Sequence, residues 1–237
     1  MKNRQLFFDL DRTLWDFETN SKNALYALFH EYNLEDEIEH FLQFHHVYVQ
    51  VNADLWQKYG KKKISKDELR DQRFVQTLSK LGVNDHQLAQ KMSDGYISTS
   101  PHQTTLFPNA LDVLKSLQQE NYRIHLITNG FKEVQFIKLE KSGLLDFFDV
   151  ILCSEEVGHT KPHVEIFREA EKLTNCRPQD AFMIGDDFKA DVTGALNAGW
   201  TAIHFDPEKK YRSDGTVKRI RDLKELPELI AQIPIVS

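Results

Sequence analysis

Short apolar segments of strand length alternate with longer segments of helical periodicity along much of this chain. Five such segments lie at Gln5–Phe8, Arg123–Thr128, Val150–Cys153, Ala181–Gly185 and Thr201–Phe205. Helical patterns separate the last four. Near-continuous apolar strands that alternate with helices are typical of a parallel sheet that is buried on both faces. The pattern therefore predicts an α/β fold.

The stretch between the first two of these strands, from about residue 17 to residue 99, shows only helical periodicity. Ser65 and Glu68 form a capping-box pattern that predicts the start of one helix, and Gly82 lies where that helix should end. Apolar and weakly polar residues recur at alternating spacings of four and three, which predicts one face of a longer helix. That face consists of Ile38, Leu42, His45, Val49, Asn52 and Trp56.

These patterns together predict a Rossmann-like parallel sheet core that carries an inserted all-helical cap. We expect residues 1–15 and 105–237 to form the α/β core domain and residues 16–104 to form the helical cap domain.

Composition excludes several classes of protein. The 237 residues are 41% hydrophobic, which is enough apolar material for a sizeable core, and their net charge of -6 lacks the basic character of a nucleic-acid binder. No apolar run approaches the roughly 20 residues that span a bilayer, and the N-terminus lacks a signal-peptide core. Cys153 and Cys176 are isolated, His45 fits a structural role, and the other nine histidines show no metal-ligand spacing. We expect a cytoplasmic protein with no membrane or nucleic-acid partner.

Polar loops follow the first four predicted strands. In open α/β sheets, ligands bind beyond the carboxyl ends of the strands, so these loops should converge in space. They contain, in chain order, Asp9-Leu10-Asp11-Arg12-Thr13, Thr128-Asn129-Gly130, Lys161-Pro162 and Gly185-Asp186-Asp187 with Asp191.

The carboxylates of these loops can carry out phosphoryl chemistry. Asp9 can act as a nucleophile, because an acyl phosphate divides one difficult displacement into two easier ones. Asp11, two residues further, can supply the general acid and then the base. Asp9 and Asp186 offer hard oxygen ligands, which suit Mg²⁺ better than Zn²⁺. Several carboxylates in one cleft would repel a phosphate without such a cation.

The remaining polar residues of the loops complete a phosphate site. The Thr128 hydroxyl and the backbone N–H groups near Asn129 can bind phosphate oxygens, and Lys161 can offset the negative charge. Each residue alone also has a structural interpretation: Thr128 as a helix N-cap, Lys161 as an exposed lysine and Asp191 as an acidic residue at a helix start. Their joint occurrence, each at its own strand end, favours catalysis.

This ordered set of motifs resembles the haloacid dehalogenase superfamily with the helical cap of its first cap class, over essentially the whole chain. The resemblance implies that Asp9 is the nucleophile and Asp11 the acid/base. It also implies that Mg²⁺ is bound by Asp9, the backbone carbonyl of Asp11 and Asp186. Further residues would support the metal waters and the lysine. These are Thr13, Asp187 and Asp191.

A narrower likeness links the chain to the bacterial pyrimidine 5′-nucleotidases that remove non-canonical nucleotides. It lies in Leu126–Phe131, Ser154–Gly158, Lys161-Pro162 and the cap segment Val51–Trp56. It implies hydrolysis of pyrimidine (deoxy)nucleoside monophosphates. Asn52 and Trp56 are then candidate contacts to the nucleoside, and the alternative is that both belong to the core of the cap.

Other functions need only part of this set of residues. A 2-haloacid dehalogenase does not need an acid at Asp11 or the pair Asp186-Asp187, and a phospho-accepting signalling module is shorter and has no cap. A non-catalytic binding protein need not keep all of these residues. A phosphoglycolate-type or other small-metabolite phosphatase shares the core motifs and remains the alternative. Both a monomer and a homodimer remain possible.

Overall fold

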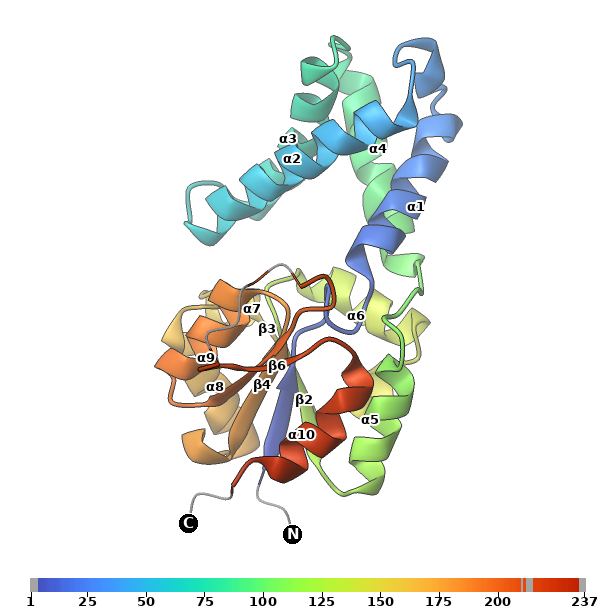
Figure 1. Cartoon of the computed structure of the whole chain (residues 1–237). Coiled ribbons are helices and arrows are strands. Elements are labelled where there is room, and N and C mark those ends of the chain that lie inside the picture. Colours follow the sequence, from blue (N-terminus) through green and yellow to red (C-terminus); the bar gives the residue numbers. More distant parts are fainter. Residues whose placement is uncertain (1–3, 210, 212–214, 235–237) are drawn as a thin grey trace. The chain divides into compact units, whose positions relative to one another are not determined.

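A parallel six-stranded sheet forms the centre of the larger of two units in the computed structural model, which describes residues 4–209, 211 and 215–234 (Figure 1). The strand order is β3-β2-β1-β4-β5-β6, and every pairing is parallel. The strands are β1 (Gln5–Phe8), β2 (Arg123–Thr128), β3 (Val150–Cys153), β4 (Ala181–Gly185), β5 (Thr201–Phe205) and β6 (Lys218–Ile220). The predicted α/β class with a Rossmann-like sheet is confirmed.

The first five strands have the predicted bounds, whereas β6 was not predicted. Its three residues are Lys218, Arg219 and Ile220, of which only Ile220 is buried. A strand this short and polar carries no apolar run, so its sequence resembles a loop. It pairs only with β5 and lies at the edge of the sheet.

The strand order reverses direction between β1 and β4. Phe8, the last residue of β1, pairs with Leu126 of β2 on one side and with Ile184 of β4 on the other. The Asp9 backbone N–H then donates to the Ile184 carbonyl at 2.9 Å. Such a reversal is where ligands bind in open α/β sheets. The loops after β1 and β4 are therefore held side by side at the place where a ligand is expected.

Helices cover both faces of this sheet. Side chains alternate along β1, so Leu6 and Phe8 join one apolar core and Phe7 joins another. The first core also takes residues from α5 (Ala110–Gln119) and α10 (Leu226–Gln232), and the second from α8 (Val164–Thr174). The remaining helical segments of this unit are α6 (Lys132–Lys141), α7 (Ser154–Val157), a π-helical turn at Phe188–Thr193 and α9 (Gly194–Asn197).

The chain divides into two compact units: residues 1–17 with 104–237 form the α/β unit, and residues 18–103 form a helical unit. The latter contains α1 (Phe17–Glu31), α2 (Phe41–Gly60), α3 (Lys66–Lys80) and α4 (His86–Thr99). The capping box of Ser65 and Glu68 opens α3 as predicted, and Gly82 follows its end with a φ of 86°. Short 3₁₀ turns lie at Leu34–Asp36, Ser100–His102, Leu145–Phe147, Pro178–Asp180 and Leu223–Glu225.

The predicted face of α2 is not the face that the helix buries. Leu42 and Val49 are 65% and 40% exposed. The residues that α2 buries are Phe44, Tyr48, Val51, Asn52 and Leu55. Apolar residues occur on two stripes of this helix, and the aromatic stripe packs into the core because Tyr48 meets the rings of Phe74 and Tyr96. Ile38 is buried but precedes the helix.

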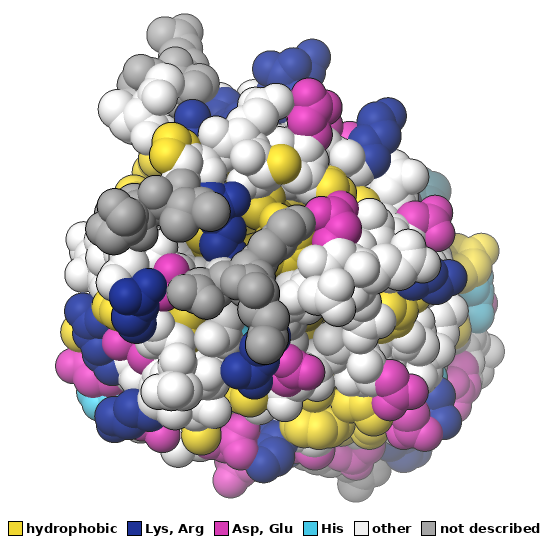
Figure 2. All heavy atoms as spheres, turned by 90° about the horizontal axis from the view of Figure 1, so that it is seen from below, with side chains coloured by type: hydrophobic (Ala, Val, Ile, Leu, Met, Phe, Trp, Pro, Cys, Tyr) yellow, Lys and Arg dark blue, Asp and Glu magenta, His cyan; other side chains and the backbone are white. Residues whose placement is uncertain are grey.

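The surface carries charges of both signs. Figure 2 shows Lys and Arg side chains interspersed with Asp and Glu on the face seen from below Figure 1. Among the described residues, no helix is both long enough and apolar enough to pass through a bilayer.

Candidate active site

Three charged side chains from distant parts of the chain form the buried centre of the α/β unit. The Lys161 ammonium lies 2.6 Å from Asp9 Oδ1 and 2.6 Å from Asp191 Oδ1, and it donates to the Ile127 carbonyl at 2.8 Å. Asp9 follows β1, Lys161 precedes α8 and Asp191 lies in the π-helical turn after β4. The structure thus brings together the segments that follow β1, β3 and β4, beside the end of β2.

Burial governs the ionisation of this group. Burial raises the pKa of Asp9 well above its usual range; Lys161 opposes this rise, and the nearby carboxylates of Asp191 and Asp186 add to it. Although burial by itself lowers the pKa of Lys161, the two carboxylates Asp191 and Asp9 raise it above its usual value. The ammonium therefore stays charged and is fixed against the carboxylate of Asp9.

Asp186 completes an acidic group at the carboxyl end of β4. Asp9, Asp186 and Asp191 each provide a carboxylate oxygen, and these atoms lie within 4.8 Å of one another. Burial and the proximity of Asp191 raise the pKa of Asp186 to about 7. A hard divalent cation among these oxygens would remove the repulsion, so the donor set fits Mg²⁺.

Thr13 and Gly185 hold the acidic residues in place. The buried Thr13 hydroxyl accepts from the Asp186 backbone N–H at 3.1 Å and donates to Asp186 Oδ1 at 3.4 Å. Asp191 Oδ2 accepts from the Asp187 N–H at 3.0 Å, and a Cβ at Gly185 would lie 2.2 Å from this oxygen. Only glycine leaves room for Asp191 to reach Lys161. Thr13 and Asp191 are thus placed to support the site.

Asp187 has a different local role. Its Oδ1 accepts from the backbone N–H groups of Lys189 and Ala190, both at 2.8 Å. The side chain therefore caps the π-helical turn that carries Asp191. A contribution of Asp187 to the metal waters stays a prediction.

Two side chains of α6 hold Asp11, and the sequence analysis missed both. Lys138 Nζ lies 2.5 Å from Asp11 Oδ1, and Gln135 Nε2 donates to Asp11 Oδ2 at 2.9 Å. Lys138 is also 4.2 Å from the centre of the Trp15 ring, which is a cation–π distance. Gln135, Lys138 and Leu139 share one buried face of α6, and their spacing alone does not show that this face is buried.

Thr128 and Asn129 hold the site together through hydrogen bonds. The Thr128 hydroxyl accepts from the Gly130 N–H at 3.0 Å and from Gln135 Nε2 at 2.7 Å. Asn129 Oδ1 accepts from the Lys161 N–H at 2.8 Å, and its Nδ2 donates to the Lys161 carbonyl at 3.1 Å. The Asn129 side chain therefore fixes the backbone of Lys161. Its predicted contact with substrate stays a prediction.

Asn52 and Trp56 belong to α2 of the helical unit. Asn52 is buried, and no described residue hydrogen-bonds to its Oδ1 atom. Trp56 is half-buried, and its ring meets that of Tyr59 edge-on at 5.7 Å. Neither observation assigns these two residues to a substrate.

Comparison with known proteins agrees with this geometry. Residues 6–205 match the family described as "Haloacid dehalogenase-like hydrolase". The chain is 32% identical to the pyrimidine 5′-nucleotidase YjjG of Escherichia coli, over 95% of this chain and 98% of that protein. It is also 32% identical to the pyrimidine 5′-nucleotidase PynA of Streptococcus pneumoniae, over 85% of this chain and 83% of the relative.

A solved structure has the same overall architecture. The magnesium-bound HAD-hydrolase YfnB from Bacillus subtilis matches with a TM-score of 0.86 and 28% identity, over 98% of this chain and 100% of that one. The family match covers the strands that carry Asp9, Thr128, Lys161 and Asp186 in their following loops. The chain is an enzyme that belongs to the haloacid dehalogenase-like hydrolases.

Proposed function

We propose that this enzyme hydrolyses pyrimidine nucleoside 5′-monophosphates in a magnesium-dependent reaction through a phosphoryl group carried by Asp9. One observation carries the proposal: the Asp9 carboxylate lies at the end of β1 with Lys161 fixed 2.6 Å from it and Asp186 in the same acidic group. A buried carboxylate with a fixed cation beside it is suited to nucleophilic attack on a phosphate ester.

In the first step, an Asp9 carboxylate oxygen attacks phosphorus and the P–O bond to the nucleoside breaks. Lys161 offsets negative charge on the nucleophile and on the transferring phosphoryl group, because its ammonium is already fixed against Asp9. The Thr128 hydroxyl and the backbone near Asn129 bind phosphoryl oxygens. Fixed donors lower the barrier because they need no reorganisation during the reaction.

Asp11 moves the proton in both steps. It protonates the departing 5′-oxygen and then removes a proton from the water that attacks the phosphoryl group on Asp9. Lys138 and Gln135 each bind one of its two carboxylate oxygens, which fixes the side chain. The products are the nucleoside and inorganic phosphate.

The acidic group provides the cation site. The Asp9 and Asp186 carboxylates and the Asp11 carbonyl would hold Mg²⁺, while Thr13 and Asp191 keep them in position. When bound, the ion supplies Lewis-acid stabilisation of negative charge on the phosphoryl oxygens.

The preference for pyrimidine nucleotides rests on the relatives and on the helical unit. Two relatives that match most of the chain are pyrimidine 5′-nucleotidases. The helical unit contains a buried acceptor, Asn52 Oδ1, to which no described residue donates, and Trp56 lies one turn further along α2. An acceptor and an aromatic ring one helical turn apart suit a nucleobase with an N–H donor and a π-face, and the choice of a pyrimidine rests on the relatives.

A substrate panel tests the function. We expect dUMP and dTMP to be hydrolysed with higher kcat/KM than purine nucleotides, phosphoglycolate or a 2-haloacid, and turnover to stop when a chelator removes Mg²⁺. Faster turnover of phosphoglycolate than of any nucleotide would replace the nucleotidase assignment with a small-metabolite phosphatase.

The role of Asp9 is tested by Asp9→Asn, which keeps the size of the side chain and removes the nucleophile. We expect turnover at background with an unchanged circular dichroism spectrum, and no acid-stable phosphate label on the protein. Activity above a few per cent of wild type would contradict the covalent mechanism.

Trp56→Ala tests the nucleoside contact. Stacking of one base contributes about 1–3 kcal/mol, so kcat/KM for dUMP should fall roughly ten- to a hundred-fold while that for p-nitrophenyl phosphate changes little. Gln50→Ala on the exposed side of the same helix is the control. Equal losses on both substrates would place Trp56 in the packing of the helical unit.

A further inference from the structure

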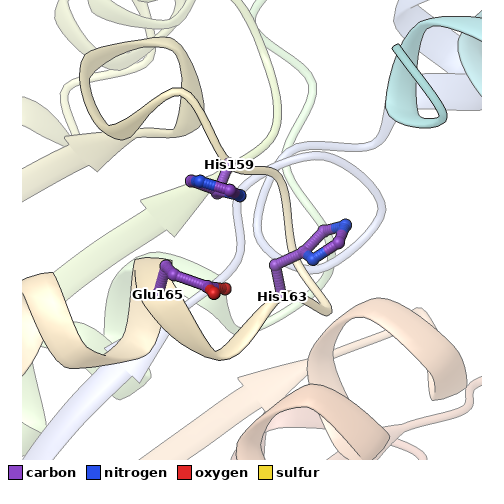
Figure 3. Close-up of side chains that lie close together, drawn as sticks. All are labelled: His159, His163 and Glu165. Carbon is purple, nitrogen blue, oxygen red and sulfur yellow. The ribbon is translucent and has the colours of Figure 1, made fainter. Parts of the chain in front are cut away.

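A second group of metal-ligating side chains lies outside the acidic site. His159, His163 and Glu165 each provide one ligand atom, and these atoms lie within 4.8 Å of one another. Figure 3 shows His159 in the loop after α7, and His163 and Glu165 at the start of α8, with the Glu165 carboxylate directed toward the space between the two rings. The ring centres are 5.6 Å apart. None of these residues belongs to the acidic group.

The three side chains are not engaged elsewhere. Within the described part of the chain, none of them forms a hydrogen bond or an ion pair, and the Nδ1 atom of His159 is buried without a partner. An unsatisfied buried nitrogen is costly, and a metal ion is one of the few partners that imidazole accepts besides hydrogen-bond donors. His163 and Glu165 are exposed, so they can rotate toward a common ion.

The backbone that carries these side chains is well fixed. The His163 N–H donates to the Thr160 carbonyl at 2.9 Å, and Asn129 binds both backbone groups of Lys161 in the middle of the segment. Ile166 and Phe167 anchor the start of α8 in the core. Closure onto an ion therefore needs only side-chain rotation.

The chemistry of the set selects the ion. Two imidazoles and one carboxylate form a known zinc set with an open fourth position, whereas Mg²⁺ prefers oxygen ligands alone. In a tetrahedral Zn²⁺ site the ligand atoms lie about 3.4 Å apart, so separations that reach up to 4.8 Å have to shorten by as much as about 1.4 Å. The positive end of the α8 dipole disfavours a cation at this position, and the negative charge of the Glu165 carboxylate offsets that effect.

We propose that His159, His163 and Glu165 form a second cation site, which binds Zn²⁺ and does not bind Mg²⁺. The ion joins His159 and His163, the residues on either side of the segment that carries Lys161. The spacing His-x₃-His-x-Glu crosses a turn and a helix start, which is why the sequence showed no familiar metal motif.

Equilibrium dialysis of the untagged full-length protein against Zn²⁺, in the presence of excess Mg²⁺, tests the site. We expect one zinc ion per chain, and His163→Ala and Glu165→Gln should each raise the Kd by at least about ten- to a hundred-fold, since even residues behind the ligands have effects of that size. Glu169→Gln on the same helix and His102→Ala, both outside the group, should bind as wild type does.

Two results would overturn the proposal. One is unchanged zinc affinity and stoichiometry in both His163→Ala and Glu165→Gln. The other is loss of the bound zinc when Mg²⁺ is added or when Asp186 is replaced by Asn, which would assign the ion to the acidic group.

Discussion

The proposed proton transfer requires that Asp11 be held within reach of the reacting atoms, and two side chains of one helix hold it. Lys138 and Gln135 lie three residues apart on α6, so they project from the same face and bind different oxygens of the carboxylate. Lys138 is almost fully buried and contacts the Trp15 ring, which restricts its own movement. We therefore expect Lys138 to position Asp11.

Lys138→Met should lower kcat/KM for a nucleoside monophosphate roughly 10- to 100-fold, the order of loss expected when a catalytic group is misplaced by about 1 Å. The loss should be smaller for p-nitrophenyl phosphate, because its leaving group needs little protonation. Steady-state kinetics on both substrates measures the difference.

Lys141→Met on the same helix is the matched control, because the Lys141 side chain is 44% exposed and lies outside the site. Equal losses on both substrates for Lys138→Met would indicate general disruption of the site.

The sequence predicts the charged residues that follow the strands, but not Gln135 and Lys138, which hold Asp11. Asp9 and Asp186 directly follow apolar runs, and Lys161 precedes a proline at a helix start, so all three lie at predictable places. Gln135 and Lys138 lie inside a helix, where their burial depends on which face packs. That choice is made by tertiary contacts, which no local pattern contains.

Helix α3 shows how a local signal determines an element. The Ser65 hydroxyl accepts from the Glu68 N–H at 3.1 Å, and the Glu68 carboxylate accepts from the Ser65 N–H at 2.7 Å. Both bonds form between residues three positions apart, so the sequence alone predicts them. The face of α2 could not be predicted in this way, because Leu42 and Phe44 are equally apolar and only the partners Phe74 and Tyr96 decide between them.

Ser65→Ala should destabilise the helical unit by about 1 kcal/mol, the usual effect of losing an N-cap side chain. Ser79→Ala, near the exposed end of the same helix, should have little effect. Denaturant unfolding followed by circular dichroism measures both, and equal midpoints for the two variants would contradict the cap's contribution.

Strand β2 contains a buried histidine that links stability to pH. His125 is fully buried, its Nε2 lies 2.8 Å from Gln5 Oε1, and burial lowers its pKa from 6.5 to about 4. Between these two values the unfolded chain binds more protons at His125 than the folded protein does. The contribution of neutral, buried His125 to the free energy of unfolding is therefore complete above pH 6.5 and is lost as the pH falls toward 4. The total loss is up to about 3 kcal/mol.

His125→Gln keeps a donor for Gln5 and removes the titration, so its unfolding free energy should fall less steeply over this pH range. His102→Gln, at an exposed position, should keep the slope of the wild type. Identical slopes for wild type and His125→Gln would show that other groups cause the acid sensitivity.

For the whole molecule, the acidic group links the stability of the folded state to the proposed Mg²⁺ ion. Ligands that bind only the folded state stabilise it by mass action, about 2.7 kcal/mol when Mg²⁺ exceeds its Kd a hundred-fold. We therefore expect Mg²⁺ to raise the Tm of the α/β unit relative to the protein in chelator, measured by scanning calorimetry.

Asp186→Asn should lose most of this shift and, without Mg²⁺, should be at least as stable as wild type, because one of the repelling buried carboxylates is gone. Asp149→Asn, at an exposed position in the same unit, should respond to Mg²⁺ as wild type does. A full response in Asp186→Asn would exclude Asp186 as a ligand.

The position of β1 has a consequence for biosynthesis. This strand is synthesised well before both of its neighbours, which lie at residues 123–128 and 181–185. Residues 18–103 are contiguous and helical, so the contacts they make with one another can form during translation. The nascent chain therefore has to keep an apolar strand unpaired while the helical unit is synthesised, and Asp9, the proposed nucleophile at the end of that strand, gains its neighbours from β4 only after residue 185.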